Sequence, residues 1–246
     1  MNAQGFQDIQ DRYWEHADPT HFRWTTRDPG FAPVEDALLL PLLGTLPRPC
    51  LEIGCGDGTN LARLVQGGAT VGIDRYPGKA TFAAQAVPTA RIATADAFHL
   101  PFRAATFASV FIRDLLHHLP EAGLAMAEAL RVLRPGGALL LMEPNGRNPF
   151  VALQARLIPA EARLKTFHVE SVLQALEGLP LVDCQVSAAQ GFPLRRLLFH
   201  HRFGLPVLGQ FALTRALVGA AEKLGERLTP RHAWSYTIVR ARRAAA

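Results

Sequence analysis

A glycine-rich run has the residue types of a small-molecule binding site. Leu51-Glu52-Ile53 is followed by glycines at positions 54, 56 and 58. Glycines let the backbone turn sharply and approach a ligand closely, and free N–H groups at the start of a following helix can hold an anionic group. The third glycine comes two residues after the second, whereas the dinucleotide fingerprint G-x-G-x-x-G places it three residues after. The spacing therefore disfavours a dinucleotide site.

The elements that would position this run form a repeating pattern. From Pro49 to Glu143, short apolar runs alternate with helix-like stretches, as in a parallel sheet with crossover helices. Strands are expected at Cys50–Ile53, Ala69–Ile73, Arg91–Thr94, Phe107–Ile112, Ala138–Met142, Leu181–Val186 and Trp234–Arg240. Helices are expected at Gly58–Gln66, Pro77–Ala86, Glu121–Leu133 and 166–177. Pro135-Gly136-Gly137 is expected to end the third of these helices before the next strand begins.

The glycine run and four later segments resemble one family in order. Leu51–Thr59 resembles motif I of the class I S-adenosylmethionine-dependent methyltransferases. The later matches are Val71–Arg75 (motif II), Ala95–Phe102 (after the third strand), Phe107–Leu119 (motif IV) and Leu130–Gly137 (before the fifth strand). The resemblance covers about Pro49 to Pro144, and the overall organisation is similar to the branch with quinone-biosynthesis and natural-product enzymes. It implies an α/β, Rossmann-like, seven-stranded and mostly parallel sheet with helices on both faces.

The resemblance also implies a binding site for S-adenosyl-L-methionine as co-substrate, with no metal expected. In this family an acid at the tip of the second strand bonds the ribose hydroxyls, and an acid after the third strand accepts from the adenine amine. The expected cofactor-binding residues are Glu52, Gly54, Cys55, Gly56, Gly58, Asp74, Arg75, Asp96, Ala97 and Arg113. A carboxylate such as Glu52 is costly to bury without partners, which favours a role at the site. Alternatives stay open: Asp74 as a helix cap, Asp96 as a turn residue and Arg113 as a partner of Asp114.

Two histidines, His117 and His118, lie in the segment that resembles motif IV. Histidine titrates near neutrality, so His117 is a candidate general base. The alternative is a packing role, because relatives with very different acceptors share this His-His-Leu. The family's reaction is an in-line displacement at a methyl group that the sulfonium charge already activates. Alignment and exclusion of water can therefore suffice without a strong base.

Two less regular regions flank the methyltransferase-like block. Residues 1–48 are expected to form an N-terminal helical lid segment, with an apolar helix at about Pro33–Leu43, ahead of a methyltransferase domain at 49–246. Its aromatic residues Tyr13, Trp14 and Trp24 suit a lid over the site or a hydrophobic clasp. Phe192–Arg231 is far longer than a hairpin loop. Apolar residues at helical spacing (Leu213, Leu217, Ala220, Leu224 and Leu228) predict a helical cap insertion there.

Composition bounds the compartment and the partners. The net charge is +5, and from Pro193 onward ten basic residues face two acidic ones. Such a segment could attract nucleic acid, an anionic membrane or an acidic substrate, or simply be a solvated surface. The three cysteines are expected to be small buried residues rather than disulfide or zinc ligands. Without a membrane-spanning run or signal-peptide core, a cytoplasmic location is expected, with peripheral membrane contact through the insertion as an addition.

The methyl acceptor is less well defined. Arg113–Leu116 stands where methyltransferases of nucleobase amino groups commonly carry Asn/Asp-Pro-Pro-aromatic, which disfavours that chemistry and a DNA partner. The long apolar and basic insertion favours a roofed pocket for a small hydrophobic metabolite. Two alternatives stay open: an RNA or protein methyltransferase with the basic segment as its footprint, and a non-catalytic S-adenosylmethionine-binding scaffold.

Overall fold

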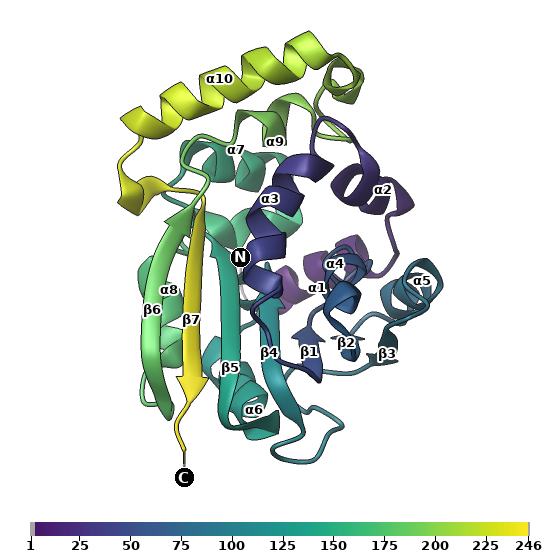
Figure 1. Cartoon of the computed structure of the whole chain (residues 1–246), viewed down its shortest axis with the longest axis vertical. Helices are drawn as coiled ribbons and strands as arrows, with labels where there is room; N and C mark the ends of the chain where they lie inside the picture. The colour runs from purple at the N-terminus through teal and green to yellow at the C-terminus, as the bar shows by residue number, and fades with distance from the viewer. Residues whose placement is uncertain (1–2, 246) are drawn as a thin grey trace.

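A computed structural model describes residues 3–245 and shows a seven-stranded sheet covered by helices (Figure 1). The strand order is β3-β2-β1-β4-β5-β7-β6, in which β1 to β5 run parallel and β7 is antiparallel to both neighbours. The strands are β1 (Cys50–Ile53), β2 (Thr70–Asp74), β3 (Arg91–Thr94), β4 (Phe107–Arg113), β5 (Leu133–Pro144), β6 (Leu181–Ala189) and β7 (Tyr236–Arg243). The expected Rossmann-like class is confirmed.

Helices cover both faces of this sheet because the central strands carry apolar side chains in both directions. Helices α6 (Ala122–Val132) and α8 (Val169–Leu176) share one buried cluster with the strand residues Val110 and Leu139. Helices α3 (Ala32–Leu43) and α4 (Leu61–Leu64) share the opposite cluster, which includes Phe111 and Leu140. Helix α5 (Pro77–Ala86) follows β2 and has the expected bounds. The core therefore holds the central strand ends rigidly from both sides.

The expected starts of helix α4 and strand β5 are wrong, and the other expected bounds match or differ by at most three residues. Helix α4 begins at Leu61 rather than Gly58, because the preceding residues form turns around Gly58, whose φ is +82°. It continues into the short 3-10 helix η1 (Val65–Gly67). Pro135–Gly137 does not separate a helix from a later strand, since β5 begins already at Leu133. Gly136, at φ +72°, and a register shift against β4 absorb the irregularity.

The N-terminal residues form two helices ahead of α3. These are α1 (Ala3–Trp14) and α2 (Pro19–Arg27). The carboxylate of Asp18 caps α2 by accepting hydrogen bonds from the N–H groups of Thr20 and His21, each 3.0 Å long. The side chain of Gln10 on α1 donates a hydrogen bond to the carbonyl of Ala160. Helix α1 is thereby attached to the segment that contains Ala160.

Helical segments also fill the two long connections after β5 and β6. Helix α7 (Pro149–Leu157) and the 3-10 helix η3 (Pro159–Lys165) precede α8. Between β6 and β7 lie α9 (Leu194–Leu198), η4 (Pro206–Gln210), α10 (Ala212–Leu228) and η5 (Arg231–Ala233). Figure 1 shows α10 at the top of the molecule, while α6 lies near the opposite end. No helix in residues 3–245 is both long and apolar enough to cross a membrane.

One cysteine departs from the expectation of burial. Cys50 and Cys55 are buried, whereas Cys184 is exposed. The reason is its place on β6, an edge strand whose side chains are largely exposed. A register shift between Val182 and Gln185 interrupts the pairing there, and Asp183 adopts φ +54°. Such irregularities discourage edge strands from pairing with other chains.

Candidate functional site

The carboxyl ends of β2, β1 and β4 lie next to one another and carry the residues of the glycine run and its partners. Gly54 follows β1, Asp74 ends β2 and Arg113 ends β4. The chain proceeds from β1 to β2 on one side and returns to β4 on the other side of β1. In open α/β sheets such a reversal opens a crevice in which ligands bind.

Three glycines shape the loop after β1. Gly54, Gly56 and Gly58 have φ values of +75°, +52° and +82°, in the left-handed region that other residues adopt at a cost. A Cβ on Gly54 would lie 2.9 Å from the side chain of Leu115, and one on Gly58 would lie 3.1 Å from that of Ala83. Around Gly56 the nearest such atom is the Lys79 Nζ, 3.9 Å away. Gly54 and Gly58 therefore permit tight packing, while Gly56 leaves its side of the loop open.

Asp74 connects this loop to the end of β2. Its carboxylate is buried and accepts hydrogen bonds from the N–H groups of Gly56, at 2.8 Å, and Tyr76, at 2.9 Å. Burial raises the pKa of Asp74 against the opposing effect of the Tyr76 N–H. The N-cap position of α5 is occupied by Tyr76, without a side-chain cap. Asp74 therefore braces the glycine loop rather than serving as the N-cap residue of α5.

A cavity of about 340 Å³ lies over these strand ends. Eight of the ten expected cofactor residues line it: Gly54, Cys55, Gly56, Asp74, Arg75, Asp96, Ala97 and Arg113. Gly58 and Glu52 do not. Asp96 also serves as a turn residue, because its carboxylate accepts the N–H of Phe98 at 2.9 Å.

Glu52 lies beneath the cavity floor. Its Oε1 accepts a 2.8 Å hydrogen bond from Asn60, whose side chain does line the cavity. Burial raises the pKa of Glu52 to about 8, although the hydrogen bond from Asn60 opposes this rise. The second carboxylate oxygen, Oε2, is buried without a hydrogen-bond partner. Glu52 therefore acts on the cavity through Asn60.

Arg113 forms part of the cavity wall through a buried ionic network. Its Nη2 donates to Glu35 at 2.7 Å and its Nη1 to Asn60 at 3.2 Å, while its Nε lies 3.1 Å from Asp114. Glu35 also accepts a 2.7 Å bond from Arg196. Burial would raise the pKa of Glu35, but the two guanidinium groups lower it to about 2. Arg113 thus both pairs with Asp114 and faces the cavity, so the two alternatives coexist.

The sequence patterns did not indicate several residues of this ionic network. They are Glu35, Asn60, Arg196 and Tyr236. For Glu35 a weak signal existed, since Glu35 and Asp36 are the two acids of a helix whose other residues are apolar; the structure buries Glu35, which is 2% exposed. No such signal marks the other three residues, Asn60, Arg196 and Tyr236. Their sequence surroundings are the same as those of ordinary surface or core residues.

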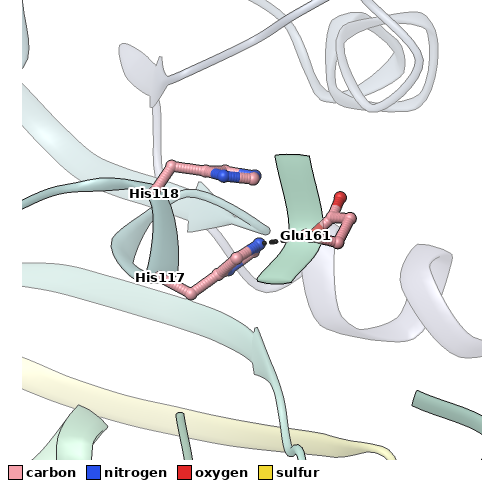
Figure 2. Close-up of side chains that lie close together, drawn as sticks. All are labelled: His117, His118 and Glu161. Atoms are coloured by element: carbon pink, nitrogen blue, oxygen red, sulfur yellow. Dashed lines mark hydrogen bonds and ion pairs between the residues drawn. The ribbon is translucent and has the colours of Figure 1, made fainter. Parts of the chain in front are cut away.

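His117 is held between two carboxylates. Its Nδ1 lies 2.9 Å from Glu143 and its Nε2 lies 3.0 Å from Glu161, with all three side chains buried. Figure 2 shows the ring of His117 directed at Glu161. Burial alone would lower the pKa of His117, but the hydrogen bonds to both carboxylates raise it to about 10. A histidine that keeps its proton at neutral pH does not suit the expected role of general base.

The other oxygen of Glu143 explains why the segment after β4 is rigid. Glu143 Oε1 accepts hydrogen bonds from the N–H groups of Leu115, at 2.8 Å, and Leu116, at 2.9 Å. These residues lead into the 3-10 helix η2 (Leu116–His118). Glu143 therefore fixes both the backbone and the His117 ring at one side of the cavity.

His118 completes a small cluster that could offer ligands to a metal ion. The ligand atoms of His117, His118 and Glu161 all lie within 4.8 Å of one another (Figure 2). Both ring nitrogens of His117 already have carboxylate partners, however, so hydrogen bonds satisfy that ring without an ion. Burial lowers the pKa of His118 to about 3, and the neighbouring His117 adds to this shift. His118 is therefore a neutral group beside the charged His117.

The N-terminal helices and the insertion between β6 and β7 together form the roof of the cavity. Tyr13, Trp14 and Trp24 line it from the N-terminal helices, and His201 and Arg202 line it from the segment after α9. The two sides meet at Asp18, whose carboxylate accepts a 2.6 Å bond from Arg202 and lies 3.2 Å from His201. The Trp24 ring also stacks on Phe31, with ring centroids 3.8 Å apart. The aromatic residues thus act both as roof and as clasp.

Comparison with known proteins agrees with this geometry. Residues 51–141 match the family described as "Methyltransferase domain". The chain is 30% identical to 27-O-demethylrifamycin SV methyltransferase of Amycolatopsis mediterranei over 149 residues, 55% of this chain and 54% of that protein. It is 28% identical to 2-methyl-6-phytyl-1,4-hydroquinone methyltransferase of Synechocystis over 162 residues, 60% of this chain and 51% of that protein. The matches thus span about half the length of these curated relatives.

A solved structure extends the comparison to the whole fold. Geranyl diphosphate C-methyltransferase from Streptomyces coelicolor, solved with Mg²⁺, geranyl diphosphate and S-adenosyl-L-homocysteine, superposes with a TM-score of 0.63. Its sequence identity is 15%, and the superposition covers 99% of this chain and 100% of that one. Residues 51–141 belong to the methyltransferase domain family, and the chain has the fold of class I S-adenosylmethionine-dependent methyltransferases.

Proposed function

We propose that this protein transfers a methyl group from S-adenosylmethionine to a small hydrophobic metabolite. The observation that carries the proposal is one roofed cavity, where the open glycine loop and two acids meet a wall of aromatic and aliphatic side chains. S-adenosylmethionine would supply a methyl group on a sulfonium, which needs no further activation. The chain's own task would be to bind, align and exclude water.

The donor half of the cavity suits a nucleoside. The open space at Gly56 lets a ligand approach the backbone, because a side chain there would fill it. Asp74, braced by two backbone N–H groups, would accept hydrogen bonds from ribose hydroxyls. Asp96 and Ala97 line the cavity after β3 and would contact the adenine, while Arg75 lies beside the ribose-binding acid. Glu52 and Gly58 would support this half from below without contacting the ligand.

The acceptor half suits a hydrophobic molecule. Trp14, Val151, Ile158 and Leu164 line the cavity, and Tyr13 and Trp24 contribute to its roof. Such walls bury apolar ligand surface and keep water away from the reacting atoms. The names of the relatives, which specify a rifamycin, a phytyl hydroquinone and geranyl diphosphate, support acceptors of this class.

We assign His117 a positioning role in this reaction. Its imidazolium ring joins Glu143, which holds the loop after β4, to Glu161 on η3. Losing this contact would release two elements of the cavity wall at once. With His117 in this role, the protein offers no base from this residue, and an acceptor that is already a good nucleophile requires none.

The proposal is tested by supplying the purified protein with methyl-tritiated S-adenosylmethionine and an extract separated into lipid-soluble, water-soluble and macromolecular fractions. We expect label in the lipid-soluble fraction, and its loss in Gly56→Arg. Gly178→Arg is the matched control, because Gly178 also has a positive φ of +72° but does not line the cavity. Label in RNA or protein would instead establish the macromolecular alternative. Donor binding without any transfer would establish a non-catalytic scaffold.

Peripheral contact with a membrane surface is a second and separate proposal. An acceptor with a long hydrocarbon part resides in a bilayer, and the segment from Pro193 onward is rich in basic residues. We therefore propose that the protein works in the cytoplasm, at the surface of the membrane.

A further inference from the structure

The outward face of α10 is apolar along its whole length. Leu213, Leu217, Leu224 and Leu228 are 71%, 63%, 60% and 78% exposed. At about 100° per residue, these four side chains fall within about 60° of the helix circumference. Val218 is the one residue of α10 that is buried. Surface helices normally turn their apolar stripe towards the core, so α10 has the reverse orientation.

Specific contacts fix this orientation. On the inward side, Glu222 accepts hydrogen bonds from Arg195, at 2.9 Å from its backbone N and 2.6 Å from its Nε. Gly225 packs so tightly against the ring of Phe192 that a Cβ there would lie 2.3 Å from it. Rotating the leucines inward would break an ion pair and clash with that ring. The exposed stripe is therefore built into the fold.

The segment before α10 adds further exposed apolar side chains. Leu205, Val207 and Phe211 are 57%, 61% and 59% exposed and lie in or next to η4. Contiguous exposed apolar patches are rare on soluble monomers and indicate a surface that another phase or partner covers. The insertion therefore presents a long apolar helix together with a shorter apolar turn.

Charge indicates what covers this surface. Lys223 and Arg227 are exposed on one flank of the leucine stripe, and Arg231 follows just after the helix. Glu222, an acid of α10, is turned inward and paired with Arg195. A basic flank beside an apolar face is the pattern of a helix lying in the interface of an anionic bilayer. A second copy of the chain would instead bring the same positive charges towards each other.

We propose that α10 and the turn before it dock on an anionic lipid bilayer, with the leucine stripe in the acyl boundary and Lys223 and Arg227 at the headgroups. The same insertion carries Arg196, His201 and Arg202, which line the cavity. Docking would then hold the cavity roof near the lipid from which a hydrophobic acceptor comes. This last consequence rests on the proposed function, whereas lipid binding does not.

The test is sedimentation of the full chain with vesicles of phosphatidylcholine alone or with phosphatidylglycerol added. We expect Leu217→Glu/Leu224→Glu to lower partitioning into both vesicle types by about tenfold or more, because apolar burial drives insertion. Lys223→Gln/Arg227→Gln should lower binding by about fivefold per charge, and only to the anionic vesicles. Leu124→Glu is the matched control, since Leu124 is 61% exposed on α6, near the other end of the molecule.

Two results would overturn the proposal. One is vesicle binding that the double leucine variant leaves unchanged while its unfolding temperature matches wild type. The other is a wild-type dimer in light scattering that this variant converts to a monomer, without binding of either protein to vesicles. Vesicle binding is measured without a methyl donor. A failure of the methyl-transfer assay would therefore contradict the proposed function but not the proposed lipid binding.

Discussion

At the scale of residues, the site depends on buried charges that other parts of the chain complete. Arg113 needs Glu35, which lies 78 residues earlier in the chain, and His117 needs Glu161, which lies 44 residues later. Each buried charge keeps its state because a partner of opposite sign lies within 3.0 Å. Removing one partner leaves the other charge buried and uncompensated, which is costly. Removing one member of such a pair should therefore lower the free energy of unfolding as well as the activity.

For His117 this argument gives a dependence of stability on pH. Its pKa rises on folding from 6.5 to about 10. Its stabilising contribution is therefore complete below about pH 6.5 and is lost as the pH rises through 10. We expect His117→Gln to lower the free energy of unfolding by about 3–5 kcal/mol near pH 6.5, and by clearly less at pH 10. Urea unfolding at several pH values measures this difference.

The exposed His232 provides the control, since His232→Gln should change the free energy of unfolding little at any pH. A difference between wild type and His117→Gln that stays constant from pH 6.5 to 10 would show that His117 is neutral in the folded protein.

Residues of the site differ in how far the sequence predicts them. Gly54, Gly56 and Asp74 could be placed because spacing and the ends of apolar runs specify them locally. Glu161 and Arg196 could not, because their neighbours in the chain carry no such pattern. They reach the cavity only after η3 and α9 pack over the sheet. Local patterns thus identify the donor half of the cavity better than its roof.

At the scale of elements, the roof depends on a contact between the N-terminal helices and the insertion between β6 and β7. Arg202 approaches Asp18 at 2.6 Å, across 184 residues of sequence. Asp18 also caps α2, so one carboxylate both starts a helix and closes the cavity. The two functions can be separated, because the cap uses Oδ1 of Asp18, whereas Arg202 donates to Oδ2 and also to the hydroxyl of Tyr13 on the same roof segment.

We expect Arg202→Ala to increase the dissociation rate of S-adenosylhomocysteine by about two- to fivefold, since an exposed ion pair contributes up to about 1 kcal/mol. Asp18→Ala should do the same and also lower the free energy of unfolding by about a further 1 kcal/mol through the lost cap. Stopped-flow release and urea unfolding measure the two effects. Equal dissociation rates in wild type and Arg202→Ala would show that this contact does not close the roof.

Element boundaries were predictable where apolar runs end abruptly. Helix α5 and strand β3 begin and end as expected, because a proline and short apolar runs mark them. Helix α4 and strand β5 differ from expectation because glycines can extend a turn or a strand as readily as they end one. The outward orientation of α10 was also invisible, since leucines at helical spacing normally indicate a face that packs on the core.

At the scale of the whole molecule, ligand binding and folding should be linked. The cavity is assembled from the loop after β1, from β2, β4 and η3, and from both roof segments, so a ligand there contacts much of the fold. S-adenosylhomocysteine at about 100 times its Kd should add about 2.7 kcal/mol of stability. For a chain of this size, we expect the Tm to rise by roughly 5–10 °C. Calorimetric scans with nicotinamide adenine dinucleotide as control measure this, and a rise with the dinucleotide alone would exclude our assignment.

The most direct test is titration calorimetry of S-adenosylmethionine with wild type, Gly56→Arg and Gly178→Arg. We predict one binding site per chain in wild type and in Gly178→Arg. In Gly56→Arg we predict a loss of affinity of about 100-fold or more, because an arginine would fill the open side of the loop after β1. Binding of equal strength in all three proteins would contradict the placement of the methyl donor in this cavity.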